Sequence, residues 1–297
     1  MSNATALKKI NDALSASFFG IAEEECVTKS GHVIPGKKVL VRQDDGSPIA
    51  IVGDRYKTVT NEEIFTGFTR ILGKSTLDLD GAKVMVRHSH NYARTFAEII
   101  IPNHEIRVGG PKVGDITQMR LVARNSYDGS TAFIVQAGGY RLACLNGQVL
   151  PADTVSYFQS KHVQSLDVNT AADNVSKTLE AFNTSREWFN ELRSRKVADG
   201  QAYACLAFAT RNKEAARLGF PSSVDEMPRG MKGLYDSWKI HAREMGGNAW
   251  ALYNTMTHFA SHHGTDADEP HENIVAAQFR REDRVRETLE SPVWTQL

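Results

Sequence analysis

Cysteine is scarce in this sequence. The 297 residues contain three, Cys26, Cys144 and Cys205, which lie far apart and form no Cys-x-x-Cys pair. An odd number of scattered thiols argues against a disulfide framework and against a structural zinc site. We therefore expect a protein of a reducing compartment.

Long apolar runs are also missing. No stretch approaches the roughly 18 apolar residues that a membrane-spanning helix needs. The N-terminal sequence MSNATALKKINDAL mixes polar and apolar residues, unlike the charged and then apolar plan of a secretory signal. The sequence predicts a cytoplasmic protein without a membrane partner.

Several signature motifs of enzymes are absent. The sequence contains no GxxxxGK(S/T) phosphate loop, no GxGxxG after an expected strand and no GxSxG nucleophile motif. These absences argue against a nucleotide-driven motor and against a hydrolase of the common folds. We expect no cofactor.

Neither sign of charge is in excess, because 35 basic residues face 35 acidic ones. The distribution is uneven: residues 1–150 hold 18 basic and 15 acidic side chains, which leaves 17 and 20 for residues 151–297. The basic excess is concentrated between residues 83 and 150. A modest excess of this kind can attract polyanions.

The apolar pattern changes along the chain and predicts the fold class. Helical spacing near the N-terminus and after Thr60 flanks short β-rich runs, and the Asp-Gly-Ser turn at 128–130 is typical of a hairpin. Past Pro151 the pattern becomes helical. We predict an α+β fold, with an antiparallel β-meander and flanking helices in residues 1–150 and a mainly helical region in 151–297, the two regions packed as one body.

One face of the meander is the first candidate site. In the expected strand 116–127, alternation places Arg120 and Arg124 on one side, about 13 Å apart at roughly 3.3 Å per residue. Arginine can bind phosphates while aromatic rings stack on bases, which is how proteins bind single-stranded nucleic acid without sequence preference. The candidate contacts are Arg94, Lys112, Arg120, Arg124, Arg141, Tyr127 and Tyr140. The alternative is an ordinary solvated sheet face whose aromatic residues belong to the core.

The histidines near the C-terminus form a second candidate. His258 and His262 stand four residues apart on an expected helix, with acidic residues in the following loop. This spacing can chelate a divalent metal. No HExxH motif is present, and a polar helix end followed by a polar loop explains the pattern with fewer assumptions.

The order of several motifs resembles a known family. A Tyr before a polar helix start (53–65), the Asn-Ser and Asp-Gly-Ser hairpin, the strand end RLACLNGQ (141–148) and the late helix GNAWALYNTMTHFASHH (247–263) together resemble the phage- and plasmid-borne proteins grouped as domain of unknown function 932. The resemblance implies a mobile element and the cytoplasm of its host. Its outline is also similar to single-strand annealing proteins of the Rad52 type.

Three hypotheses follow. The first is a non-enzymatic protein that binds and anneals single-stranded DNA as a homo-oligomer. The second is an interaction module that acts on a phage or host protein through its acidic helical half. The third is a metal-dependent enzyme that uses His258 and His262.

Overall fold

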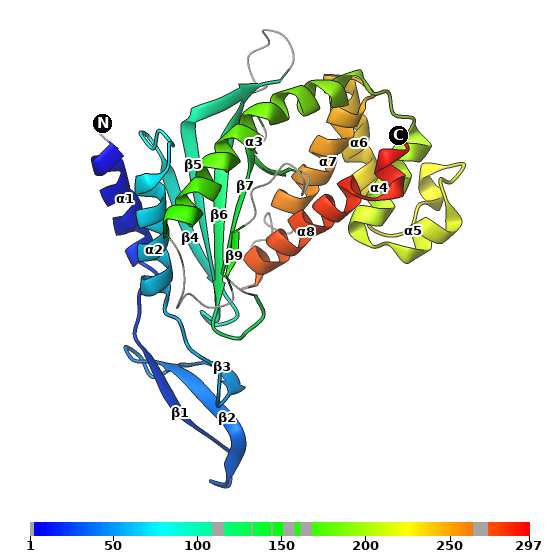
Figure 1. The fold of residues 1–297 in the computed structure, drawn as a ribbon. Helices are drawn as coiled ribbons and strands as arrows, with labels where there is room; N and C mark the ends of the chain where they lie inside the picture. The colour runs from blue at the N-terminus through cyan, green and yellow to red at the C-terminus, as the bar shows by residue number, and fades with distance from the viewer. Residues whose placement is uncertain are drawn as a thin grey trace.

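The N-terminal half of the chain forms most of two antiparallel sheets (Figure 1). The computed structural model describes residues 3–108, 116–131, 133–143, 145–150, 158–160, 168–263 and 273–297. The smaller sheet has the order β1 (Ile21–Val27), β2 (Val33–Arg42) and β3 (Pro48–Gly53). It projects away from the rest of the molecule, and we call it the arm (residues 21–53).

The larger sheet is a meander in which chain neighbours are also sheet neighbours. Its order is β4 (Lys83–Ser89), β5 (Arg94–Arg107), β6 (Ile116–Ser126), β7 (Phe133–Arg141) and β8 (Asn146–Val149), and β9 (Phe158–Ser160) also pairs with β7. The β6–β7 hairpin turns at the predicted Asp-Gly-Ser, where Gly129 has a φ of 69°. A positive φ carries little steric cost for glycine.

Helices make up most of the remainder. α1 (Asn3–Ser15) and α2 (Asn61–Lys74) flank the smaller sheet along the chain. The C-terminal half contains α3 (Val168–Ser194), α4 (Asp199–Thr210), α5 (Lys213–Leu218), η2 (Val224–Glu226), α6 (Met231–Met245), α7 (Ala249–His262), α8 (Ile274–Leu289) and α9 (Pro292–Thr295). The predicted α+β class is therefore confirmed.

Helices cover both faces of the larger sheet. On one face, Met119, Leu121 and Ala123 of β6 share a buried apolar cluster with residues of α1, α2 and α3. On the other, Phe96 and Val122 pack against α8. The same large cluster continues into α4 and α7, so residues from both predicted regions build one core.

In the described ranges, no helix combines the length and the apolar character needed to cross a membrane.

Candidate functional site

Arg120 lies inside the protein, although the sequence predicted that it faces solvent. Its side chain is 2% exposed and is held between two carboxylates. Its Nε donates to Glu98 Oε2 at 2.9 Å, and its two terminal nitrogens donate to the Glu282 carboxylate of α8 at 3.0 Å each. Glu98 also pairs with Arg87 on the neighbouring strand β4. A buried ion in this position is paired and cannot bind phosphate.

Arg124 is covered by the same helix. Its NH1 lies 3.1 Å from Asp283 Oδ2, and its guanidinium carbon lies 4.6 Å from the centre of the Phe279 ring. Phe279 in turn stacks on Phe96 of β5 at 4.7 Å, with the two rings nearly parallel. The acidic and aromatic side chains of α8 thus occupy the positions in which phosphates and bases were expected.

The remaining predicted contacts do not form a groove. Arg141 is buried, with its guanidinium carbon 5.7 Å from the centre of the Trp250 ring, and Tyr127 is buried with its hydroxyl accepting the Asn61 amide proton at 2.8 Å. Tyr140 is half-buried. Arg94 pairs with Asp128 at 2.8 Å, and Lys112 lies outside the described residues.

The predicted exposed basic face is therefore wrong. The alternation along β6 was correct, since Arg120 and Arg124 do share one face. The error concerned what covers that face: α8, more than 150 residues away in sequence, supplies matching carboxylates. Binding of single-stranded DNA stays a prediction, but Arg120, Arg124, Arg141 and Tyr127 cannot carry it while the helices are packed on the sheet.

Gly147 lies near the start of β8, beside the ion pair. A Cβ atom on Gly147 would lie 2.6 Å from Arg120 NH1 and 3.1 Å from Glu282 Oε1. The Gly147 amide donates to Ser261 Oγ of α7 at 3.0 Å. Glycine at this position makes room for the ion pair between the sheet and α8.

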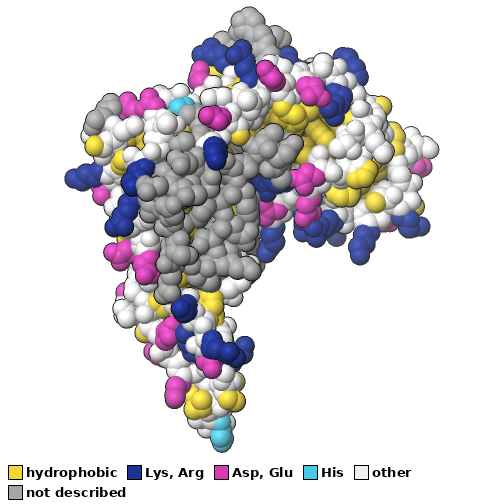
Figure 2. Space-filling model, in the orientation of Figure 1, with side chains coloured by type: hydrophobic (Ala, Val, Ile, Leu, Met, Phe, Trp, Pro, Cys, Tyr) yellow, Lys and Arg dark blue, Asp and Glu magenta, His cyan; other side chains and the backbone are white. Residues whose placement is uncertain are grey.

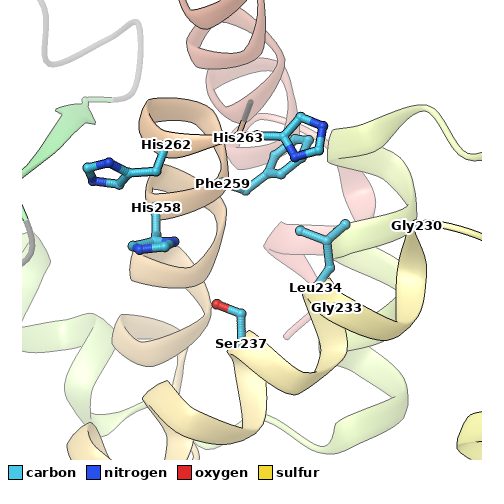
Figure 3. A pocket seen from close by; sticks show the side chains of 8 residues that line it. All are labelled: Gly230, Gly233, Leu234, Ser237, His258, Phe259, His262 and His263. Carbon is cyan, nitrogen blue, oxygen red and sulfur yellow. The ribbon is translucent and has the colours of Figure 1, made fainter. Parts of the chain in front are cut away.

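A pocket of about 420 Å³ lies between α6 and α7 (Figure 3). His258 and His262 lie on one side of α7 and Phe259 and His263 on another. The full lining is Gly230, Gly233, Leu234, Ser237, His258, Phe259, His262 and His263. Its walls are largely apolar, with imidazoles as the main polar groups.

The imidazoles beside this pocket take part in the protein's own packing. The rings of His258 and His262 are 4.7 Å apart, and His241 of α6 lies 5.6 Å from His258. His262 Nε2 is 3.0 Å from Asn146 Oδ1, and His241 Nδ1 is 2.9 Å from Thr255 Oγ1. Burial, His258 and Arg141 together lower the pKa of His241 to about 4. His241 is therefore neutral at physiological pH.

The metal hypothesis gains no ligand set from this arrangement. Within the described ranges, no group of three or more His, Cys, Asp or Glu side chains is placed to hold a metal ion. The acidic loop that the hypothesis also used, residues 266–271, lies outside those ranges.

The root of the arm is a cluster of stacked side chains. The guanidinium carbon of Arg42, at the end of β2, lies 4.8 Å from the centre of the Phe19 ring and 4.3 Å from that of Tyr92. Arg42 Nε also donates to Asp44 at 2.9 Å. The ring centre of His88 of β4 lies 4.7 Å from that of Tyr92. Burial of His88 and, to a smaller extent, the positive charge of Arg42 lower the pKa of His88 to about 4. The cluster attaches the arm to the larger sheet.

A strained turn strengthens this attachment. His90, Asn91 and Tyr92, between β4 and β5, all have positive φ values, of 53°, 51° and 64°. Such a conformation costs a non-glycine residue of the order of 1 kcal/mol or more. Asn91 Nδ2 donates to the Pro48 carbonyl of the arm at 2.7 Å, and the His90 amide donates to Asn273 beside α8, also at 2.7 Å. The turn therefore ties the arm to both the sheet and α8.

The arm exposes apolar side chains to solvent. Val27 and Val33 face each other across β1 and β2 and are 51% and 55% exposed, and Ile51 of β3 is 63% exposed. Ile34 is also exposed. Figure 2 shows apolar surface close to the far end of the arm. A projecting sheet with apolar surface and open edges is typical of a contact site for another chain.

Sequence reasoning did not single out these residues. It predicted short β-rich runs before Thr60, but not that the sheet they form stands apart from the core. A usable signal was present, since three consecutive glutamates in Glu23–Glu25 and the Pro-Gly pair at 35–36 both oppose burial of the strands that contain them.

Comparison with known proteins gives one match. A search of curated proteins and a search of solved structures each find no match. A family model described as Domain of unknown function (DUF932) matches residues 48–291, from the first residue of β3 to just beyond α8. The match spans most of the chain, so the chain belongs to the DUF932 family.

Proposed function

We propose that this chain is a protein-interaction module that binds another protein chain through the arm. The observation that carries the proposal is the gathering of exposed apolar side chains on a sheet that projects from the body. Complete burial of one such side chain contributes about 1.5–3 kcal/mol. Two or three of them supply at most about 9 kcal/mol before the cost of association is subtracted, so micromolar binding requires further contacts beside them.

The charge of the arm favours a protein over a nucleic acid as partner. Residues 21–53 contain five acidic and four basic side chains. Several of the basic ones are already paired, among them Lys38 with Glu23 at 2.8 Å. Strong binding of a polyanion depends on an excess of positive charge, and the arm has none.

The test is affinity capture from nuclease-treated lysate followed by cross-linking. The exposed Lys29 and Lys37 lie on the arm and are suitable attachment points for a lysine-reactive cross-linker. We expect cross-links from these two lysines to a captured protein. We also expect a Val27→Ser, Val33→Ser double variant to weaken its binding at least tenfold.

A matched control is available in the helical half. Leu218 and Ile240 are 54% and 53% exposed, so a Leu218→Ser, Ile240→Ser double variant removes similar apolar surface away from the arm. It should bind as the wild type does. Equal binding by the arm variant and the wild type would reject the proposal, as would capture that depends on nucleic acid.

A further inference from the structure

Arg281 of α8 carries a buried positive charge that is paired with no carboxylate in the part of the chain that the structure describes. The residue is 8% exposed. Its Nε donates to the Ala260 carbonyl at 3.1 Å, and its NH2 donates to the His263 carbonyl at 3.0 Å. Both acceptors lie at the C-terminal end of α7, where the helix carbonyls together carry roughly half a negative charge. The guanidinium charge is therefore only partly compensated, although buried charges in proteins are normally paired.

The pocket between α6 and α7 lies beside this charge. The guanidinium carbon of Arg281 is 5.8 Å from the centre of the Phe259 ring, and both Phe259 and His263 line the pocket. Burial of His263 and the charge of Arg281 lower the pKa of the His263 imidazole. Arg280 and Arg284 on the same helix are further cations whose charge acts on Arg281. None of the described lining residues is acidic, so the pocket favours negative charge.

Two polar groups of the lining are open to a ligand. Among the described residues, the Ser237 hydroxyl and the ring nitrogens of His263 have no hydrogen-bond partner. Figure 3 shows Ser237 on α6 and His263 at the end of α7. A hydroxyl and an imidazole can each donate to an anionic oxygen. Leu234 and Phe259 add apolar surface to the same pocket.

The pocket has room for a small organic molecule. Its volume of about 420 Å³ lies within the range of about 300–1,000 Å³ that small-molecule sites span. Gly233 contributes to this space, because no atom lies within 4 Å of the position that a Cβ would take. Walls that are largely apolar cannot replace the hydration of an inorganic ion. The pocket therefore suits an organic anion better than an inorganic one.

We infer that this pocket binds a small organic anion. The apolar part of the ligand would lie against Leu234 and Phe259. Its acid group would accept hydrogen bonds from Ser237 and His263, with Arg281 as the counter-charge behind the wall. The same charge opposes a cationic ligand, and a neutral ligand leaves it uncompensated. The pocket lies in the helical half, away from the arm, so the inference does not depend on the proposed function.

The test is isothermal titration calorimetry of the full chain with naphthoate and with naphthamide, its uncharged counterpart of nearly the same shape. We expect naphthoate to bind at least tenfold more tightly than naphthamide. Gly233→Leu should weaken naphthoate binding at least tenfold, because the new side chain fills the open space. Ala216→Leu is the matched control, since it adds apolar surface at an exposed position of α5 outside the lining. It should bind as the wild type does.

Arg281→Gln tests the origin of the charge preference. It should bring the affinity for naphthoate close to that for naphthamide, and thermal unfolding checks that the variant is folded. The comparison of the two ligands on the wild type and on Gly233→Leu stands even if Arg281→Gln does not fold. Equal binding of the two ligands by the wild type would overturn the inference, as would the absence of naphthoate binding. Undiminished naphthoate binding by Gly233→Leu would overturn it too.

Discussion

At the scale of single residues, the contact between the larger sheet and α8 depends on charges removed from water. Arg120, Glu98 and Glu282 are each almost fully buried. Removing one partner of a buried ion pair lowers the stability of the fold by more than the intact pair contributes to it. The reason is that the remaining charge stays buried without a partner. These side chains therefore act in the stability of the fold.

Glu282→Gln should lower the free energy of unfolding by about 3–5 kcal/mol, since Arg120 loses a bidentate carboxylate in the interior. Urea denaturation measures the change. Asp283→Asn on the same helix is the control, because Asp283 is 42% exposed and its pair with Arg124 is partly solvated; there we expect about 1 kcal/mol or less. Equal effects of the two variants would contradict the structural role of Glu282.

Gly147→Ala should also destabilise the protein, by about 1–3 kcal/mol, because the added methyl group overlaps Arg120 NH1. Gly233→Ala in α6 is its counterpart. The Cβ site of Gly233 has no neighbour within 4 Å, and alanine favours helix, so that variant should be neutral or slightly more stable. Thermal unfolding of both proteins compares them, and a neutral Gly147→Ala would show that the ion pair has room to move.

His241 should make stability depend on pH. Its pKa in the fold is about 4, against roughly 6.5 in an unfolded chain. Between these values only the unfolded state takes up the proton, so the free energy of unfolding falls as the pH decreases from about 6.5 to about 4. His241→Gln should reduce this fall by at most about 1.4 kcal/mol per pH unit. Parallel pH profiles for the variant and the wild type would show that His241 does not contribute.

From the sequence we predicted correctly which side of a strand each side chain faces, but not whether that side is buried. The period of two along β6 correctly separated Arg120 and Arg124 from Met119 and Leu121. Alternation gives the side of a strand but not what covers that side. Here the covering carboxylates come from α8, and no local pattern links positions so far apart.

At the scale of elements, helix starts were predicted well because their chemistry is local. α2 begins with a capping box in which the Thr60 side chain accepts the Glu63 amide proton and the Glu63 carboxylate accepts the Thr60 amide proton. The helix continues through Gly73 to Lys74. Glycine at position 73 lets α1 pack closely, since a Cβ there would lie 3.2 Å from the Leu7 side chain.

Thr60→Ala should lower the free energy of unfolding by about 1 kcal/mol. The Glu63 amide proton loses its acceptor, the Thr60 hydroxyl, and the hydrogen bond from the amide of residue 60 to the Glu63 carboxylate loses the reciprocal bond that holds it in place. Thr184→Ala is the control, since that exposed hydroxyl bonds only to Ala181 O within α3. Chemical denaturation should show little change for the control. A Thr60→Ala variant as stable as the wild type would show that the cap contributes nothing measurable.

At the scale of the whole molecule, the sequence predicted the class of fold but not the division between core and arm. The apolar runs of β1 to β3 resemble those of the larger sheet, so both were assigned to one meander. What distinguishes them is long-range: helices cover β4 to β8 on both faces, while the arm packs on the body mainly through Leu40, Ile49 and Val52. Among the described strands, the arm is therefore the sheet that the helices leave uncovered.

Amide hydrogen exchange tests this account most directly. It is measured on the full chain with and without the captured protein, and with a single-stranded oligonucleotide. The account predicts slower exchange in residues 27–34 when the captured protein is bound, and no change in residues 116–126 with the oligonucleotide. Slower exchange in residues 116–126 with the oligonucleotide, and an arm that is unaffected by the captured protein, would contradict it.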